Sequence, residues 1–95
     1  MRVTIITVVK NDKINIGRTI DSVLNQNYKN IEYIIIDGNS NDGTIETLNE
    51  YKSKNDNVKL IFKDNHGVYD ALNEGLRLAS GEIICFLHSD DFFNS

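Results

Sequence analysis

Four short apolar runs are spaced along the chain, and segments with a different periodicity separate them. The runs are Val3–Val9, Ile31–Ile36, Val58–Phe62 and Glu82–Leu87. Each is short and rich in β-branched or aromatic residues, which predicts a β-strand. The first, second and fourth runs are nearly continuous rather than alternating. This pattern is typical of strands that are covered on both faces in a parallel sheet.

Helical periodicity predicts three helices between these strands, because apolar residues recur every three or four positions on one face. The stripes are Ile16, Ile20, Val23 and Leu24; then Ile45, Leu48 and Tyr51; then Val68, Ala71, Leu72, Leu76 and Ala79. After the third stripe, Ser80-Gly81 supplies a glycine that commonly ends a helix in the left-handed conformation. Asn39, Ser40 and Asp42 are candidates to cap the second helix.

The predicted order is therefore β-α-β-α-β-α-β, which defines an α/β fold with a three-layer, mostly parallel, doubly wound sheet. We expect the strand order 3-2-1-4. Winding then reverses between strands 1 and 4, and ligands bind beyond the carboxyl ends of strands at such a point. Strand 1 ends near Val9-Lys10-Asn11, and strand 4 ends at His88-Ser89-Asp90-Asp91. These two segments are thus predicted to lie in a ligand-binding crevice.

Composition narrows the choice of ligand. The chain has 95 residues, 40% of them apolar and 25% charged, which suits one small globular domain. Its net charge is −4 and no basic stripe is visible, so nucleic-acid binding is not indicated. An anionic ligand would need a bridging cation. The single cysteine, Cys85, excludes an intrachain disulfide, and no run reaches the ~20 apolar residues of a membrane span.

Several nucleotide and metal motifs are missing. The first βα loop, residues 10–15, contains no glycine, so neither a G-x-x-x-x-G-K-[ST] loop nor a G-x-G-x-x-G fingerprint follows strand 1. A nucleotidyltransferase would also need a glycine-rich loop there. No Cys/His cluster has zinc spacing.

Asp37 opens the segment Asp-Gly-Asn-Ser-Asn-Asp-Gly-Thr directly after the second strand. A carboxylate at a strand end can accept a hydrogen bond from a ring N–H, such as that of uracil or guanine. Alternatively, the segment is only a turn, since Asp, Gly, Asn and Ser all favour turns. We interpret Asp37 as functional, and Asp42, Gly43 and Thr44 as loop and cap residues.

Asp90 and Asp91 are adjacent acids at the end of the fourth strand, where their charges repel each other. A hard cation such as Mg²⁺ or Mn²⁺ would relieve this repulsion, and it typically uses one or two carboxylates together with substrate phosphates. The alternative is an acidic loop or a helix N-cap. Gly67 either lets the backbone approach a ligand or makes a turn, and His66 and His88 fit loop histidines better than metal ligands.

Taken together, these segments resemble the N-terminal half of an inverting family 2 glycosyltransferase with the GT-A fold. The matching pieces run from Thr4 to Asp91 in the family's order. They are Thr4–Val9 with Asn11, Thr19–Gln26, Glu32–Thr44, Gly67–Gly75 and Ala79–Asp91. The variant I-D-G-x-S-x-D-G-T with G-[IV]-Y-D-A-x-N is most similar to the branch that builds bacterial exopolysaccharide, of the colanic-acid type.

The resemblance implies roles for individual positions. Thr7, Val8 and Val9 would lie along the nucleotide base, Asp37 would accept the base N–H, and Gly67 would sit at the nucleotide-facing loop. Asp90 would face the ribose or the metal. Asp91 would bind Mn²⁺ or Mg²⁺ on a UDP- or GDP-linked sugar.

The sequence departs from the family pattern at four positions. Lys10 stands where an aromatic residue is common, Val8 where proline is common, and Gly38 where a second acid is frequent. His88 replaces the first acid of the metal motif, which is usually written DxD.

In this family a carboxylate base deprotonates the acceptor, and the metal stabilises the departing diphosphate. That base would lie beyond Ser95, so we expect residues 1–95 to be a single incomplete domain without the acceptor half. The resemblance implies a role in polysaccharide synthesis in the cytoplasm or at the inner face of the membrane. We also expect an unpaired edge at strand 4, which favours self-association. The alternatives are a non-catalytic nucleotide-sugar-binding module and an interaction domain of receiver type.

Overall fold

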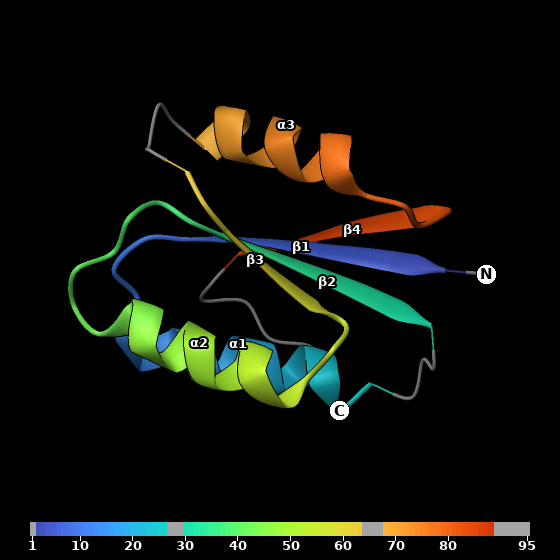
Figure 1. Cartoon of the computed structure of the whole chain (residues 1–95). Coiled ribbons are helices and arrows are strands. Elements are labelled where there is room, and N and C mark those ends of the chain that lie inside the picture. The colour runs from blue at the N-terminus through green and yellow to red at the C-terminus, as the bar shows by residue number, and fades with distance from the viewer. Residues whose placement is uncertain (1, 27–29, 64–67, 89–95) are drawn as a thin grey trace.

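Four parallel strands form the middle layer of the fold, and helices cover both of its faces (Figure 1). The computed structural model describes residues 2–26, 30–63 and 68–88, with the side chains of residues 68–70 and 88 left aside. The strands are β1 (Val3–Val9), β2 (Ile31–Asp37), β3 (Val58–Phe62) and β4 (Ile83–His88). The helices are α1 (Lys13–Leu24), α2 (Thr44–Lys54) and α3 (Val68–Leu78). All seven predicted elements are therefore present in the predicted order.

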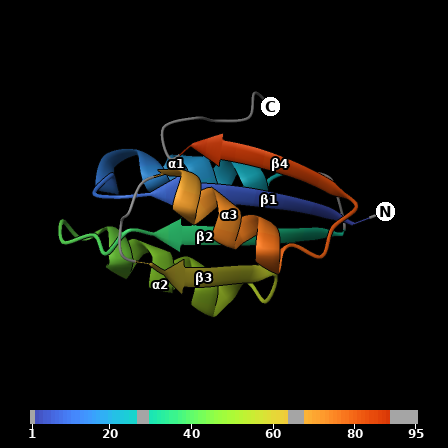
Figure 2. The same cartoon turned by 90° about the horizontal axis from the view of Figure 1, so that it is seen from above.

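The strand order is β3-β2-β1-β4, with every pair parallel, which confirms the order predicted from the sequence. The arrowheads of all four strands point to the same side of the sheet (Figure 2). Val9 of β1 pairs with Asp37 of β2, and Val8 pairs with His88 of β4. The carboxyl ends of β1, β2 and β4 thus meet at one edge, which places the candidate site.

Side chains of β1 alternate between the two faces of the sheet, as the two-residue period of a strand requires. Ile5 and Val9 face α1 and α2, where they join the larger core cluster, and Ile6 faces α3. Both faces of β1 and β2 are buried, which explains why these two strands are almost continuously apolar. The predicted stripe of α1 is confirmed, because Ile16, Ile20 and Val23 are all buried.

Helix α3 lies over β1 and β2, and it packs against them closely (Figure 2). A methyl group added at Gly75 would stand 2.8 Å from Cγ2 of Ile6 and 3.2 Å from Cδ1 of Ile36. The prediction that Leu76 belongs to the buried stripe is wrong, since this side chain is 43% exposed. Gly75 takes the position nearest the sheet, and Ala71, Leu72 and Leu78 complete the contact.

Two helix ends differ from the predictions. Gly81 does not adopt the left-handed conformation, because Gly43 is the only glycine with a positive φ in the described chain. Gly81 is instead required for close approach: a Cβ there would lie 2.5 Å from Oγ1 of Thr4 and 2.9 Å from the carbonyl oxygen of Arg2. At the start of α2 the N-cap is Gly43, with φ of 101°, rather than Asn39, Ser40 or Asp42.

A buried carboxylate ties the amino ends of the strands together. Glu32 of β2 is only 1% exposed, and its Oε1 accepts hydrogen bonds from the Thr4 hydroxyl and the Ser80 N–H, both at 2.9 Å. Its Oε2 lies 2.6 Å from the ammonium group of Lys59 and 3.5 Å from the guanidinium of Arg2. These bonds offset the cost of removing the carboxylate from water. They join β1, β2, β3 and the α3–β4 connection.

The outer face of β4 is partly uncovered. Ile84 and Phe86 pair with Thr4 and Ile6, so their side chains share the face that α3 covers farther along the sheet. They are 38% and 50% exposed. The expected edge position of β4 is confirmed. In the described part of the chain, none of the helices has the length and apolarity needed to cross a membrane.

Replacing Gly75 with alanine should destabilise the fold by about 1–2 kcal/mol in urea unfolding. The added methyl group overpacks the α3–sheet contact, and this cost exceeds the better helix propensity of alanine. Gly17→Ala in α1 is the matched control. The nearest atom to a Cβ at Gly17 is the Tyr51 hydroxyl oxygen at 3.6 Å, so this variant should be stabilised by up to about 1 kcal/mol. Equal stabilisation by both substitutions would contradict the close packing at Gly75.

The Glu32 network predicts a loss of stability in acid. Burial raises the pKa of Glu32, but the hydrogen bonds from Lys59, Ser80 and Thr4 outweigh it and lower the pKa from 4.5 to about 2. A lowered pKa stabilises the fold above the unfolded-state value, and this contribution of about 3 kcal/mol is lost as the pH falls from about 5 towards 2. Urea unfolding at several pH values should show this slope.

Glu32→Gln should flatten the slope between pH 5 and pH 2, because glutamine does not titrate. Glu82→Gln, which changes an exposed acid near the same end of the sheet, should keep the slope of the unmodified chain. If the Glu32→Gln profile ran parallel to that of the unmodified chain, Glu32 would not be the titrating group.

Candidate nucleotide-binding edge

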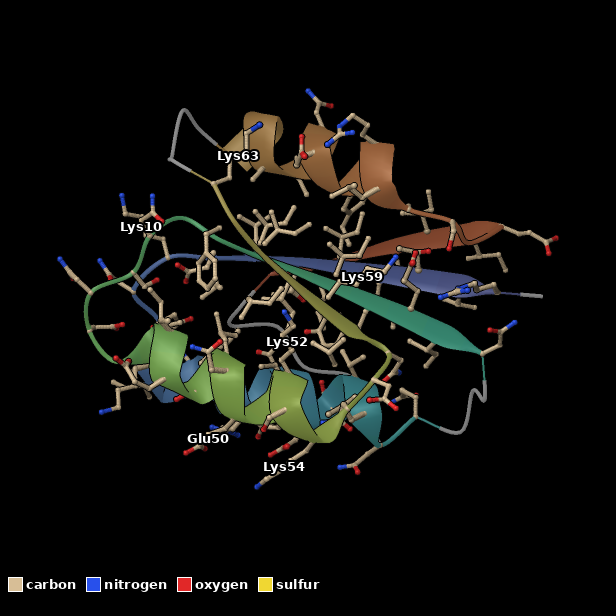
Figure 3. All side chains as sticks on the ribbon, in the orientation of Figure 1. Lys10, Glu50, Lys52, Lys54, Lys59 and Lys63 are labelled. Atoms are coloured by element: carbon tan, nitrogen blue, oxygen red, sulfur yellow. The ribbon has the colours of Figure 1, made fainter. Side chains whose placement is uncertain are left out.

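Two loops lie side by side at the carboxyl edge of the sheet, after β1 and after β2 (Figure 1). The hydrogen-bond ladder between β1 and β2 continues for one further hydrogen bond. In it, the Gly38 N–H donates to the Val9 carbonyl oxygen at 2.9 Å. Lys10, at the start of the first loop, is exposed and extends outward at this end of the sheet (Figure 3). The candidate site therefore begins at the residues that directly follow β1 and β2.

Asp37 is the last residue of β2 and is fully buried. Its Oδ2 accepts a hydrogen bond of 2.8 Å from the backbone N–H of Ser40, and its Oδ1 accepts one of 2.6 Å from the Ser40 hydroxyl. Both carboxylate oxygens are thus bonded to a single residue three positions later. The strand end and the following turn form one rigid unit.

Ser40 also connects the two loops. Its hydroxyl oxygen accepts a hydrogen bond of 2.8 Å from the backbone N–H of Asn11, in the β1–α1 loop. In return, Oδ1 of Asn11 accepts a bond of 2.8 Å from the N–H of Asn41. Asn11 and Asn39 have positive φ angles of 51° and 62°, a conformation that asparagine tolerates better than most residues.

Farther from the strands, Asp42 and Thr44 make a second connection. Oδ1 of Asp42 accepts a hydrogen bond of 3.0 Å from the Thr44 N–H, and Oδ2 accepts one of 3.2 Å from the Lys13 N–H. The Thr44 hydroxyl accepts from the Asp12 N–H at 3.2 Å. The hydrogen bond from the Thr44 hydroxyl, above all, lowers the pKa of Asp42. The interpretation of Asp42 as a loop residue is confirmed, whereas Gly43 is the N-cap of α2 and Thr44 is its first residue.

The β1 residues expected along a base have different surroundings. Thr7 and Val9 are buried on the face that α1 and α2 cover, and Oγ1 of Thr7 lies 2.8 Å from the hydroxyl oxygen of Tyr33. Burial raises the pKa of Tyr33. Val8 is half-buried on the other face, beside an apolar cavity of about 30 Å³ lined by Ile6, Val8, Leu72, Phe86 and Leu87.

Three predicted site residues, Gly67, Asp90 and Asp91, lie outside the described residues, as does the side chain of His88. Residues 2–26, 30–63 and 68–88 contain no group of three or more His, Cys, Asp or Glu side chains that could hold a metal ion. Asp90 and Asp91 therefore stay the predicted ligands of Mn²⁺ or Mg²⁺. The backbone of β4 reaches the site edge at His88, two positions before Asp90 in the sequence.

The sequence did not single out Asn11 and Ser40 as a contact pair. The available signal was weak: small polar residues follow both strands, and Ser40 fitted a helix cap equally well. Only the pairing of β1 with β2 shows that residues 29 positions apart in the chain share a hydrogen bond.

Comparison with known proteins assigns the chain to a family. Residues 4–95 match the model of glycosyl transferase family 2. The chain belongs to this family, which confirms that part of the resemblance found in the sequence.

Relatives of this chain are longer proteins. It is 45% identical over 91 residues to an uncharacterized glycosyltransferase of Haemophilus influenzae. It is 41% identical over 93 residues to the UDP-Glc:alpha-D-GlcNAc-diphosphoundecaprenol beta-1,3-glucosyltransferase WfaP of Escherichia coli. These matches cover 95% and 96% of this chain but 36% of each relative. The chain thus spans about a third of their length.

Solved structures share the fold. The mannosyltransferase PcManGT of Pyrobaculum calidifontis, in complex with GDP-Man and Mn²⁺, superposes with a TM-score of 0.91 at 27% identity. The match covers 99% of this chain and 29% of PcManGT. TarS 1-349 of S. aureus in complex with UDP gives a TM-score of 0.89 at 26% identity, with 99% and 29% of the two chains covered. The α/β arrangement is therefore that of the GT-A fold.

The left-handed conformation of Asn11 can be tested by two substitutions. Both Asn11→Gly and Asn11→Ala lose the bond to Asn41, but alanine also opposes the positive φ, so Asn11→Ala should be less stable by about 1 kcal/mol. The same two substitutions at Asn49, an exposed position within α2, should give the opposite order, because glycine weakens a helix. Urea midpoints measure both pairs. The same order at both positions would contradict the conformation assigned to Asn11.

Proposed function

We propose that the chain forms the donor-binding part of a glycosyltransferase that transfers a sugar from a nucleotide diphosphate to an acceptor. The main support is the order β3-β2-β1-β4, which brings the loops after β1 and β2 to the edge where β4 leads into Asp90 and Asp91. The GDP-Man and UDP complexes of structures with this fold agree with a nucleotide-sugar ligand.

In this proposal the base lies along the end of β1, beside Val8 and the backbone of Thr7 and Val9. Asp90 and Asp91 hold Mn²⁺ or Mg²⁺, which supplies positive charge to the sugar diphosphate. The Mn²⁺ in the PcManGT complex supports this choice of cation. Gly67 faces the nucleotide from the β3–α3 loop, and the catalytic base belongs to the part of the protein after Ser95.

The pathway is proposed from the relatives. WfaP is named for transfer to a diphosphoundecaprenol-linked sugar, which is a lipid-borne acceptor. A related role for the protein that contains this chain would be exopolysaccharide assembly of the colanic-acid type, in the cytoplasm at the inner face of the membrane. The exposed apolar side chains of β4 support self-association of the isolated chain through this edge.

Nucleotide binding should depend on the cation and on Asp91. In calorimetry, UDP or GDP should bind the chain with Mn²⁺ present and bind at least about tenfold more weakly after Asp91→Asn, because a metal ligand is lost. Asp56→Asn, in the exposed loop before β3, is the control and should bind like the unmodified chain. No transfer of labelled sugar by the chain alone is expected. Equal affinity with and without Mn²⁺ in all variants would argue against the metal site.

A further inference from the structure

The carboxylate of Asp37 is buried, and both of its oxygens are bonded to Ser40. We infer that Asp37 is a positioning residue. It orients Ser40, Ser40 holds the backbone of Asn11, and this relay fixes the loops after β1 and β2 relative to each other before a nucleotide binds. The inference rests on the proposed function and extends it to residues that act without touching the ligand.

The hydrogen bonds give the relay a direction. The Ser40 hydroxyl has one hydrogen, and it donates this hydrogen to Oδ1 of Asp37. A lone pair of the same oxygen is then left for the Asn11 N–H at 2.8 Å. Asp37 thus orients the Ser40 hydroxyl so that its oxygen can accept the hydrogen bond from the Asn11 N–H in the β1–α1 loop. A bond to a carboxylate is shorter and stronger than one between neutral groups, in agreement with the 2.6 Å distance.

The far end of the relay lies in the β1–α1 loop, which follows the strand end where the proposed base lies. Asn11 follows Val9 by two residues and has a left-handed backbone, which the bond to Ser40 and the bond from Asn41 stabilise. A loop that is ordered in advance loses less conformational freedom on binding, which raises affinity. The relay ends on backbone atoms, so it should affect nucleotides with different bases equally.

A direct contact between Asp37 and the base predicts a different result. Uracil presents a ring N–H that a carboxylate can accept, whereas cytosine presents an acceptor at the equivalent ring nitrogen. Direct contact would therefore make the preference for UDP over CDP depend on Asp37. The relay predicts that Asp37 and Ser40 change both affinities by the same factor and leave their ratio unchanged.

The test is calorimetry of UDP and CDP with Mn²⁺ for Asp37→Asn, Ser40→Ala and the double variant. We expect each single change to weaken both ligands by about tenfold and the double variant to be no weaker than the weaker single variant, since the two residues act as one unit. Ser40→Thr, which keeps the hydroxyl, should retain most of the affinity. Ser53→Ala, at an exposed serine of α2, should match the unmodified chain.

Amide hydrogen exchange without nucleotide gives a second readout. The Asn11 and Asn41 amides should exchange slowly in the unmodified chain and faster in Asp37→Asn and Ser40→Ala, while β1 amides such as Ile6 keep their protection. Unchanged exchange at Asn11 would overturn the relay, as would loss of the UDP preference in Asp37→Asn alone. If the unmodified chain bound neither nucleotide, the proposed function would fail, whereas faster Asn11 exchange in the variants would still support the relay.

Discussion

The buried carboxylate of Glu32 is the interaction on which the arrangement of the sheet depends. It accepts hydrogen bonds from β1 and from the α3–β4 connection, and it pairs with Lys59 of β3. A single charged group thus links β1, β2 and β3 near their amino ends to the connection that leads into β4. Removing one partner would leave a charge in a nearly water-free place, a large cost for a domain of this size. Through Ser80, the link holds the connection that leads into β4, the strand that pairs with β1.

The two ends of β2 use the same chemistry for different purposes. Glu32 near the start and Asp37 at the end are both buried acids, and each accepts one backbone N–H and one side-chain O–H. They lie on opposite faces of the sheet, since Asp37 follows Glu32 by five positions and side chains alternate along a strand. At the amino end, Glu32 binds the backbone of the α3–β4 connection through Ser80. At the carboxyl end it shapes the loops that the proposed donor would meet.

A small domain has little apolar core to spare, and this chain compensates with close packing and short polar contacts. Gly75 brings α3 onto Ile6 and Ile36, and Gly81 brings the α3–β4 connection onto Thr4. Neither glycine is needed for a positive φ. Their shared purpose is to let backbone approach backbone or side chain, which keeps both faces of a thin sheet covered.

The sequence by itself determined the element order, the parallel sheet and the family, because continuous apolar strands alternated with amphipathic helices and the motifs followed in a fixed order. It also indicated the strand ends where the site would form. Only the tertiary structure decided that Gly75 replaces Leu76 at the sheet, that Glu32 is a central buried acid, and that Asp37 reaches Asn11 through Ser40. The physical reason is the sequence separation of the residues in contact. Periodicity reports on neighbours within a few residues, whereas these contacts join positions that only the pairing of strands brings together.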